Sequence, residues 1–157
     1  LVVIKNTRFG GTLNPEKAAT LALYHEVSET KLQDINSNTK YHNPEFTKAF
    51  KRLEDLAEKE CLATLPEDLR AAMEPLIVQA EVDPEYKAIV KAADILQAYV
   101  KTKNELRFHN NEFEHVKQNL DRKLAELEAS MPEVKCFIEI FLDSCTTTLD
   151  KLSEVQY

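Results

Sequence analysis

Four side chains that could bind a divalent metal ion and move a proton occur at two places in the sequence. His25, Glu26 and Glu29 supply an imidazole and two carboxylates within five residues. Asp94 lies much later, in a stretch that is otherwise rich in apolar residues. Histidine nitrogens and carboxylate oxygens bind divalent ions, and a bound ion lowers the pKa of a coordinated water. These residue types therefore make a metal-dependent hydrolytic site one candidate.

Each of these groups also has an explanation that needs no metal. His25 and Glu29 are four residues apart, so they share a face of a helix and could form an ion pair at its end. Lys91 precedes Asp94 by one helical turn, and a salt bridge would offset the cost of a partly buried carboxylate. Asp34 lies in a polar stretch, where it could belong to a site or stabilise a turn. The residues alone leave these alternatives open.

The other three histidines, His42, His109 and His115, are candidates for a separate site. His109 is close to Arg107 in a polar connection, and His115 follows Glu112 on a charged helix face. Histidines in such surroundings are usually solvated, and we expect the same of these.

Length and composition predict one globular helical domain over residues 1–157. The chain is 43% hydrophobic and 30% charged, and it is long enough to bury a core without disulfides or a structural metal. Gly10 and Gly11 are its only glycines. Because an all-β fold needs many glycine-containing turns, this scarcity favours an all-α fold.

Charge and cysteine content limit the partners and the compartment. The net charge of −7 argues against a nucleic-acid polymer, since binding one requires lysines and arginines that neutralise phosphates. No apolar run approaches the length of a membrane span, so no membrane partner is expected. Cys61, Cys136 and Cys145 are widely spaced, which indicates reduced, buried thiols in a cytoplasmic protein.

Capping residues and apolar spacing predict a series of helices with no sheet. Residues 5–14 and 31–43 are expected to be loops. The expected helices run from Pro15 to about Ser28, from Pro44 through Ala57, from about Thr64 through Ile77 with a kink or break at Pro75, from Pro84 to about Leu106, from about Glu112 to Ala129, and from Pro132 through Leu149.

The chain opens on an apolar segment, Leu1–Asn6, that contains no methionine. This segment looks like the last turns of a helix whose beginning is missing, so we expect the natural protein to have further N-terminal helices. The alternative is an apolar start to a short helix or strand.

Short blocks spread over almost the whole chain, in a fixed order and spacing, carry a family resemblance. They are Arg8–Gly11, Leu23–His25, Ser28–Glu29, Lys40–Tyr41, Pro66–Arg70, Lys91–Asp94 with Ala98–Tyr99, Asn110–Phe113, Phe141 and Thr148–Asp150. The chain resembles the HD-domain 5′-deoxynucleotidases of the YfbR type, which remove phosphate from deoxyribonucleoside 5′-monophosphates. The resemblance implies an all-helical HD fold, a divalent ion such as cobalt, manganese or magnesium, a nucleoside monophosphate as substrate, and a homodimer.

The resemblance also implies roles for individual residues. His25 and Asp94 match metal ligands of the family, and Glu26 stands where the family has an aspartate. Glu29 matches a glutamate that assists the attacking water, and Asp34 matches an aspartate near the nucleotide. The family's early metal-binding histidine and its phosphate-binding arginine would both precede the first residue of this chain.

Two hypotheses follow. The first is a metal-dependent phosphohydrolase acting on nucleoside 5′-monophosphates, with His25, Glu26 and Asp94 as metal ligands, Glu29 acting on the water and Asp34 binding substrate. The alternative is a catalytically impaired HD-fold protein kept for nucleotide binding or protein assembly. Glu26 favours the alternative, because one extra methylene can displace a carboxylate beyond the tolerance of a preorganised site. The presence of His25, Glu29 and Asp94 together favours the enzyme.

Overall fold

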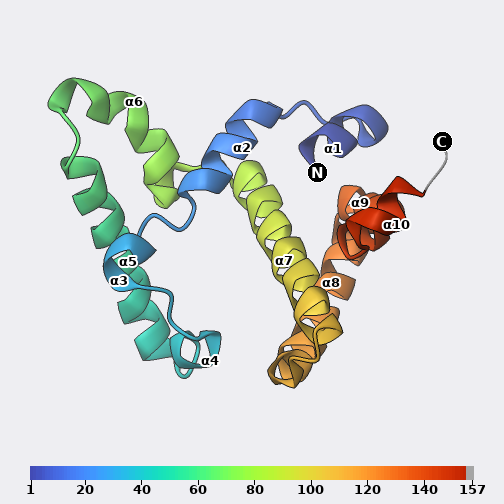
Figure 1. Ribbon diagram of the computed structural model, residues 1–157. Coiled ribbons are helices and arrows are strands. Elements are labelled where there is room, and N and C mark those ends of the chain that lie inside the picture. The colour runs from blue at the N-terminus through green and yellow to red at the C-terminus, as the bar shows by residue number, and fades with distance from the viewer. Residues whose placement is uncertain (155–157) are drawn as a thin grey trace. The chain divides into compact units, whose positions relative to one another are not determined.

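The protein is helical throughout the part that the computed structural model describes, residues 1–154, and no strand occurs there (Figure 1). This confirms the all-α prediction and agrees with the HD-type fold that the resemblance implies. The helices are α1 (Val2–Phe9), α2 (Pro15–Tyr24), α3 (Glu29–Leu32), α4 (Ser37–Lys40), α5 (Pro44–Ala63), α6 (Glu67–Ile77), α7 (Pro84–Arg107), α8 (Glu114–Ser130), α9 (Pro132–Cys145) and α10 (Leu149–Ser153), with short 3₁₀ helices η1 (Gln79–Glu81) and η2 (Asn111–Phe113).

The helices divide into two compact units. The first unit contains residues 1–15 and the described chain from Ala88 onward, and the second contains residues 16–87. Helix α7 begins in the second unit and continues into the first. The single domain predicted from the sequence stays a prediction. Within residues 1–154, no helix is both long enough and apolar enough to cross a lipid bilayer.

The core of the first unit lies among α7, α8 and α9. Ala92 and Leu96 of α7 meet Leu124 of α8 and Val134 of α9, and all four are buried. Burying a leucine or valine side chain contributes about 1.5–3 kcal/mol, so this cluster stabilises the unit substantially. Helix α1 packs against α9 beside it.

The second unit is organised around α5, against which α3, α4, α6 and η1 all pack. Its core contains the buried residues Leu62, Ile77 and Val78. Tyr24 and Val27 pack against the same cluster. The chain that follows α2 is therefore held by the core of this unit, and that chain carries the candidate site residues.

Two of the predicted helix boundaries have identifiable local causes. The Asn43 side chain accepts a hydrogen bond from the Phe46 N–H at 2.8 Å and so caps α5, and Pro44 takes the first helical position. The Asp83 carboxylate accepts the N–H of Glu85 at 2.8 Å in the same way before α7. Pro75 does not break α6 where it stands, and the helix ends two residues later.

The first helix is longer than the sequence predicted. Residues 5–14 were expected to form a loop, but α1 continues to Phe9. Its packing against α9 stabilises positions such as Asn6 and Thr7, whose intrinsic helix propensity is low. Gly10 follows with a φ of 69°, a left-handed conformation that glycine adopts without strain, and the helix ends there.

The polar stretch 31–43, also predicted to be a loop, is partly helical. It contains the end of α3 and the whole of α4, each only four residues long. Helices this short are not stable in isolation, and both pack against α5. Packing against α5 therefore stabilises these two short helices, and no local sequence pattern predicts them.

The last predicted helix is two helices. It was expected to run from Pro132 through Leu149, but α9 ends at Cys145 and α10 begins at Leu149. Between them, the Thr147 hydroxyl donates to a backbone carbonyl at 2.8 Å, and the Thr148 hydroxyl accepts an amide N–H as the cap of α10. Threonine side chains that bond to the backbone compete with a continuous helix.

The cysteines are less uniformly buried than expected. Cys136 is buried, and its sulfur accepts a hydrogen bond from the Arg8 guanidinium at 3.1 Å. Cys61 is half-buried and Cys145 is exposed. The prediction that all three thiols are buried is therefore wrong for Cys145, which lies at the end of a helix where the chain turns.

Glu58 of α5 is a buried carboxylate in the second unit, with only 4% of its surface exposed. Its Oε2 accepts the Gln79 N–H at 2.9 Å and ties α5 to η1. Burial raises the pKa of Glu58 above its ordinary value of 4.5, with smaller contributions from the charges of Asp55 and Glu54, while Gln79 and Lys87 oppose the rise. Protonation of Glu58 therefore favours the folded state.

The sign of this coupling makes a testable prediction. The stabilisation from protonated Glu58 is fully present below the unfolded pKa and is lost as the pH rises through the higher folded pKa. Glu58→Gln removes this dependence, so the stability of the variant relative to the parent should increase as the pH rises from about 4 toward neutrality. Urea unfolding across that range measures the difference.

Glu45→Gln, at an exposed position on the same helix, is the control and should show no such increase. A difference between Glu58→Gln and the parent that is flat with pH, or that falls as pH rises, would contradict this account of Glu58.

Candidate active site

The candidate site begins at the turn that ends α2. The sequence predicted a helix to about Ser28, but α2 ends at Tyr24 and α3 starts at Glu29. In between, the Val27 N–H bonds to the Tyr24 carbonyl and the Glu29 N–H to the Glu26 carbonyl, at 3.0 and 2.9 Å. The expectation that His25 and Glu29 share one helix face is therefore wrong, since no continuous helix joins them.

The His25 ring is fixed by a hydrogen bond to the backbone. Its Nδ1 lies 2.7 Å from the Ala22 carbonyl oxygen. A carbonyl only accepts hydrogen bonds, so Nδ1 carries a proton, and in the neutral form of the ring the lone pair is at Nε2. That Nε2 is buried and has no hydrogen-bond partner.

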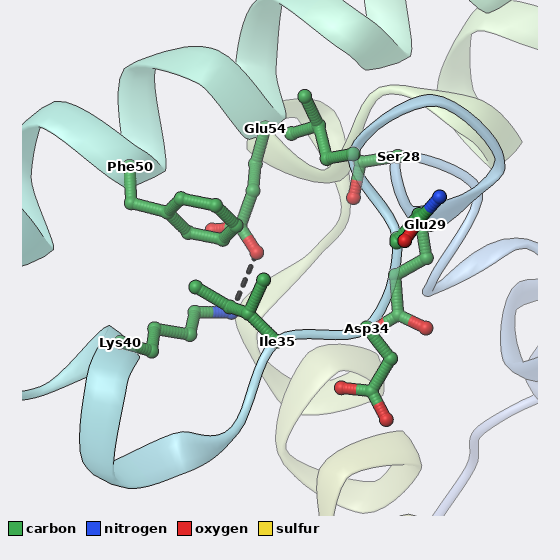
Figure 2. Close-up of a pocket in the computed structure, with 9 residues that line it drawn as sticks. Ser28, Glu29, Asp34, Ile35, Lys40, Phe50 and Glu54 are labelled. Carbon is green, nitrogen blue, oxygen red and sulfur yellow. Dashed lines mark hydrogen bonds and ion pairs between the residues drawn. The ribbon is translucent and has the colours of Figure 1, made fainter.

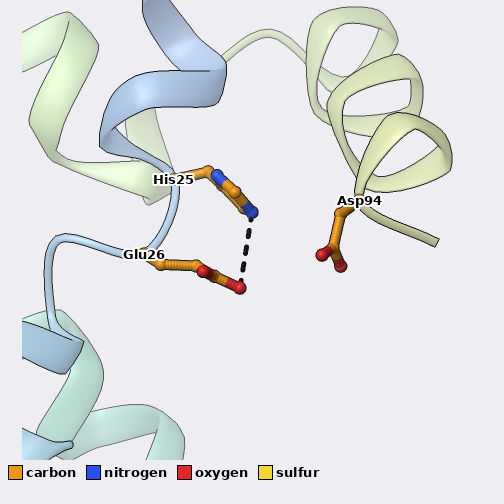
Figure 3. Close-up of side chains that lie close together, drawn as sticks. All are labelled: His25, Glu26 and Asp94. Carbon is orange, nitrogen blue, oxygen red and sulfur yellow. Dashed lines mark ion pairs between the residues drawn. The ribbon is translucent and has the colours of Figure 1, made fainter. Parts of the chain in front are cut away.

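The carboxylate of Glu26 faces this lone pair. Figure 3 shows the Nε2 of His25 directed at the Glu26 side chain, and the nearest oxygen, Oε1, lies 3.4 Å away. When the ring is protonated the two groups form an ion pair, and when it is neutral they are two electron-pair donors that a cation can bridge. Metal-binding histidines usually donate their other N–H to a carbonyl or carboxylate, as His25 does. The donor pair therefore fits a divalent ion.

Asp94 projects from α7 in the first unit (Figure 3). Its Oδ2 accepts a hydrogen bond from the Lys91 ammonium at 2.6 Å, so the salt bridge considered from the sequence is present. The Asp94 side chain is 25% exposed and that of Lys91 is 65% exposed. A pair this open to solvent contributes only about 0–1 kcal/mol, and Lys91 can leave Asp94 at little cost.

Glu29 and Asp34 lie together on the wall of a hollow in the second unit (Figure 2). The cavity volume of the hollow is only about 10 Å³, room for roughly one water molecule. Its lining residues are Ser28, Glu29, Leu32, Gln33, Asp34, Ile35, Lys40, Phe50 and Glu54. Binding pockets for whole ligands usually measure about 300–1,000 Å³, so this hollow is a small indentation beside Glu29 and Asp34 and does not itself hold a nucleotide.

The surroundings of Glu29 suit a group that accepts a proton. Burial raises the pKa of Glu29, the negative charges of Glu26 and Asp34 raise it further, and Lys40 and His25 oppose the rise. A carboxylate whose pKa moves toward neutrality is a more effective general base at physiological pH.

The three remaining histidines are all exposed. His42 lines a separate open hollow with Thr39, Asn43 and Phe46. His109 has a positive φ of 63° at the end of its helix, and His115 lies in the first turn of α8. Their exposure agrees with the solvated role that the sequence favoured for them.

Sequence reasoning missed Lys40, Phe50 and Glu54 as lining residues. The Lys40 ammonium bonds to Glu54 Oε1 at 2.5 Å and lies 5.3 Å from the centre of the Phe50 ring. Phe50 and Glu54 are four residues apart on α5 and therefore share one face of that helix. This spacing was visible in the sequence, but nothing there placed α4 opposite it.

Comparison with known proteins bears on what this site does. The chain matches the family model described as "5′-deoxynucleotidase YfbR-like" over residues 1–145. The chain belongs to the YfbR-like family. It is 43% identical over 153 residues to a 5′-deoxynucleotidase of Vibrio cholerae, an alignment that covers 98% of this chain and 78% of the relative. It is 40% identical over 154 residues to a 5′-deoxynucleotidase of Erwinia tasmaniensis, covering 98% and 77%.

A third YfbR-like relative, a 5′-deoxynucleotidase of Yersinia pestis, is 38% identical over 153 residues, with 98% of this chain and 77% of that protein covered. Likeness at this level over nearly all of the chain extends through both compact units. It confirms the family that the sequence blocks indicated.

The tautomer of His25 gives a direct test of the site geometry. We expect long-range ¹H–¹⁵N spectra of the metal-free protein, at mildly alkaline pH, to show His25 protonated at Nδ1 and unprotonated at Nε2, because Nδ1 donates to the Ala22 carbonyl. His42, which is exposed, serves as the internal reference and should show the Nε2-protonated form that free imidazoles favour. A His25 ring protonated at Nε2 would contradict the geometry described here.

Proposed function

We propose that this chain is a phosphohydrolase that uses a divalent metal ion to remove phosphate from nucleoside 5′-monophosphates, deoxyribonucleotides included. The observation that carries this proposal is the family membership, with relatives of 38–43% identity named 5′-deoxynucleotidases across 98% of the chain. The buried Nε2 of His25, which has no hydrogen-bond partner and faces the Glu26 carboxylate, supports it from the chemistry of the site.

The proposed metal ligands are His25, Glu26 and Asp94. They supply one imidazole nitrogen and carboxylate oxygens, a donor set that suits manganese, cobalt or magnesium. When bound, such an ion lowers the pKa of a coordinated water and offsets negative charge on phosphate oxygens. Glu26 keeps a carboxylate where the family has an aspartate, and its length is compatible with an approach to the His25 ring.

The other proposed roles belong to two carboxylate side chains, Glu29 and Asp34. Glu29 orients the attacking water or accepts its proton, a role that its raised pKa supports. Asp34 shares the hollow with Glu29 and contacts the nucleotide. The proposal also includes a homodimer in the cytoplasm, as the resemblance and the reduced cysteines suggest.

Phosphate release is the direct test of this function. Purified protein should liberate phosphate from a panel of deoxyribonucleoside and ribonucleoside 5′-monophosphates when manganese, cobalt or magnesium is present, and a chelator should abolish the release. His25→Ala and Asp94→Ala should each lower kcat/KM by about 100-fold or more, because each removes a metal ligand. Lys123→Met, at an exposed position of α8, is the control and should keep parental activity.

Two outcomes would overturn the proposal. The first is no release with any of the metals from a protein whose circular dichroism shows a folded helical chain. The second is release that is insensitive to chelators and to both substitutions.

Glu26 allows a separate prediction about the position where this chain differs from the family. Glu26→Asp should keep kcat/KM within about 10-fold of the parent, because it retains a carboxylate, whereas Glu26→Gln should lower it by about 100-fold. Metal titration of both variants by calorimetry gives a second readout, in which only Glu26→Gln loses affinity. Equal activity of Glu26→Gln and the parent would remove Glu26 from the proposed ligand set.

A further inference from the structure

The loop that carries Asp34 has little structure of its own. It joins α3 to α4, each of only four residues, and it begins at Gln33 with φ 62° and ψ 161°. That conformation is one that residues other than glycine adopt only when the surrounding structure holds them there. The position of Asp34 therefore depends on what fixes the two ends of this loop.

Lys40 fixes the end of this loop that leads into α4. Its ammonium is bonded to Glu54 Oε1 of α5 at 2.5 Å and lies 5.3 Å from the centre of the Phe50 ring. Its backbone carbonyl accepts the Thr47 hydroxyl at 2.9 Å. The side chains of Lys40 and Glu54 are only 25% and 22% exposed. An ion pair shielded from water in this way is more strongly coupled than an open surface pair.

Among the described residues that line the hollow, Lys40 is also the one cation. In Figure 2, Lys40 and Glu54 lie on one side and Glu29 and Asp34 on the other. The charges of Lys40 and Glu29 act on each other, and Asp34 and Glu29 repel. Three carboxylates around a small hollow would move apart without a positive charge among them.

We propose that Lys40, anchored by Glu54, is a positioning residue that holds Asp34 and Glu29 on the wall of the hollow in the arrangement that binds the nucleotide. This inference rests on the proposed function for its kinetic consequence and on the geometry of the second unit for its structural one. Nothing in it requires Lys40 to touch the substrate.

The chain offers a matched control for this proposal. Lys31 of α3 forms an ion pair with Glu60 of α5 at 2.6 Å, with side chains 39% and 50% exposed. Like the Lys40–Glu54 pair, it links a four-residue helix to α5. Unlike that pair, it does not line the hollow. A purely structural effect of losing such a link should therefore be common to Lys31→Met and Lys40→Met.

The kinetic test compares Lys40→Met, Lys40→Arg and Lys31→Met in the metal-loaded protein. Lys40→Met should raise KM for a deoxyribonucleoside 5′-monophosphate by about 10-fold, with a smaller change in kcat, because the geometry of the binding residues is lost. Lys40→Arg keeps the charge and should recover most of the affinity. Lys31→Met should stay within about two-fold of the parent.

A structural readout keeps this inference separate from the enzymatic one. In ¹⁵N-labelled protein, Lys40→Met should shift the backbone amide signals of residues 33–36, Lys40→Arg should largely restore them, and Lys31→Met should leave them in place. Equal effects of Lys40→Met and Lys31→Met on these signals, or a Lys40→Arg variant as impaired as Lys40→Met, would overturn the role of Lys40. If the parent itself releases no phosphate, the proposed function fails, and the amide signals alone decide on Lys40.

Discussion

The hydrogen bond from His25 Nδ1 to the Ala22 carbonyl is the interaction on which the candidate site depends. It fixes the ring at the end of α2 and leaves the Nε2 lone pair buried, 3.4 Å from a Glu26 carboxylate oxygen. A buried acceptor without a partner is costly, and a second acceptor beside it adds repulsion. A proton on Nε2 or a divalent cation relieves both, so the geometry of this turn suits a metal ion without requiring one.

The same electrostatic constraint extends from this turn to the neighbouring hollow. Glu26, Glu29 and Asp34 gather on a short length of chain, and their mutual repulsion together with burial raises the pKa of Glu29. Lys40 supplies positive charge on the opposite wall, where Glu54 holds it. The proposed chemistry needs these carboxylates close enough to bind an ion and accept a proton. The positive charge of Lys40 offsets the repulsion among them. The closeness of the carboxylates that the proposed chemistry needs therefore also disfavours the folded arrangement of this turn.

The sequence predicted the long elements and the residue types of the site, but not the local geometry. Helices α5 and α7 begin at Pro44 and Pro84 as expected, because capping side chains and proline act over a few residues. The existence of α4 depends on packing against α5, which local patterns do not encode. On α7, Ala92 is fully buried whereas Ala93 is exposed, since the neighbouring helices decide which face is covered. Family resemblance supplied the roles of Glu29 and Asp34.

The most direct test of the central claim is anomalous diffraction from crystals of the protein loaded with manganese. The account predicts one strong anomalous peak bonded to His25 Nε2, at about 2.2 Å, with carboxylate oxygens of Glu26 and Asp94 completing the protein ligands. The peak should disappear in His25→Ala crystals grown in the same way. A peak away from His25, or none at a manganese concentration that supports catalysis, would contradict the assignment of this turn as the metal site.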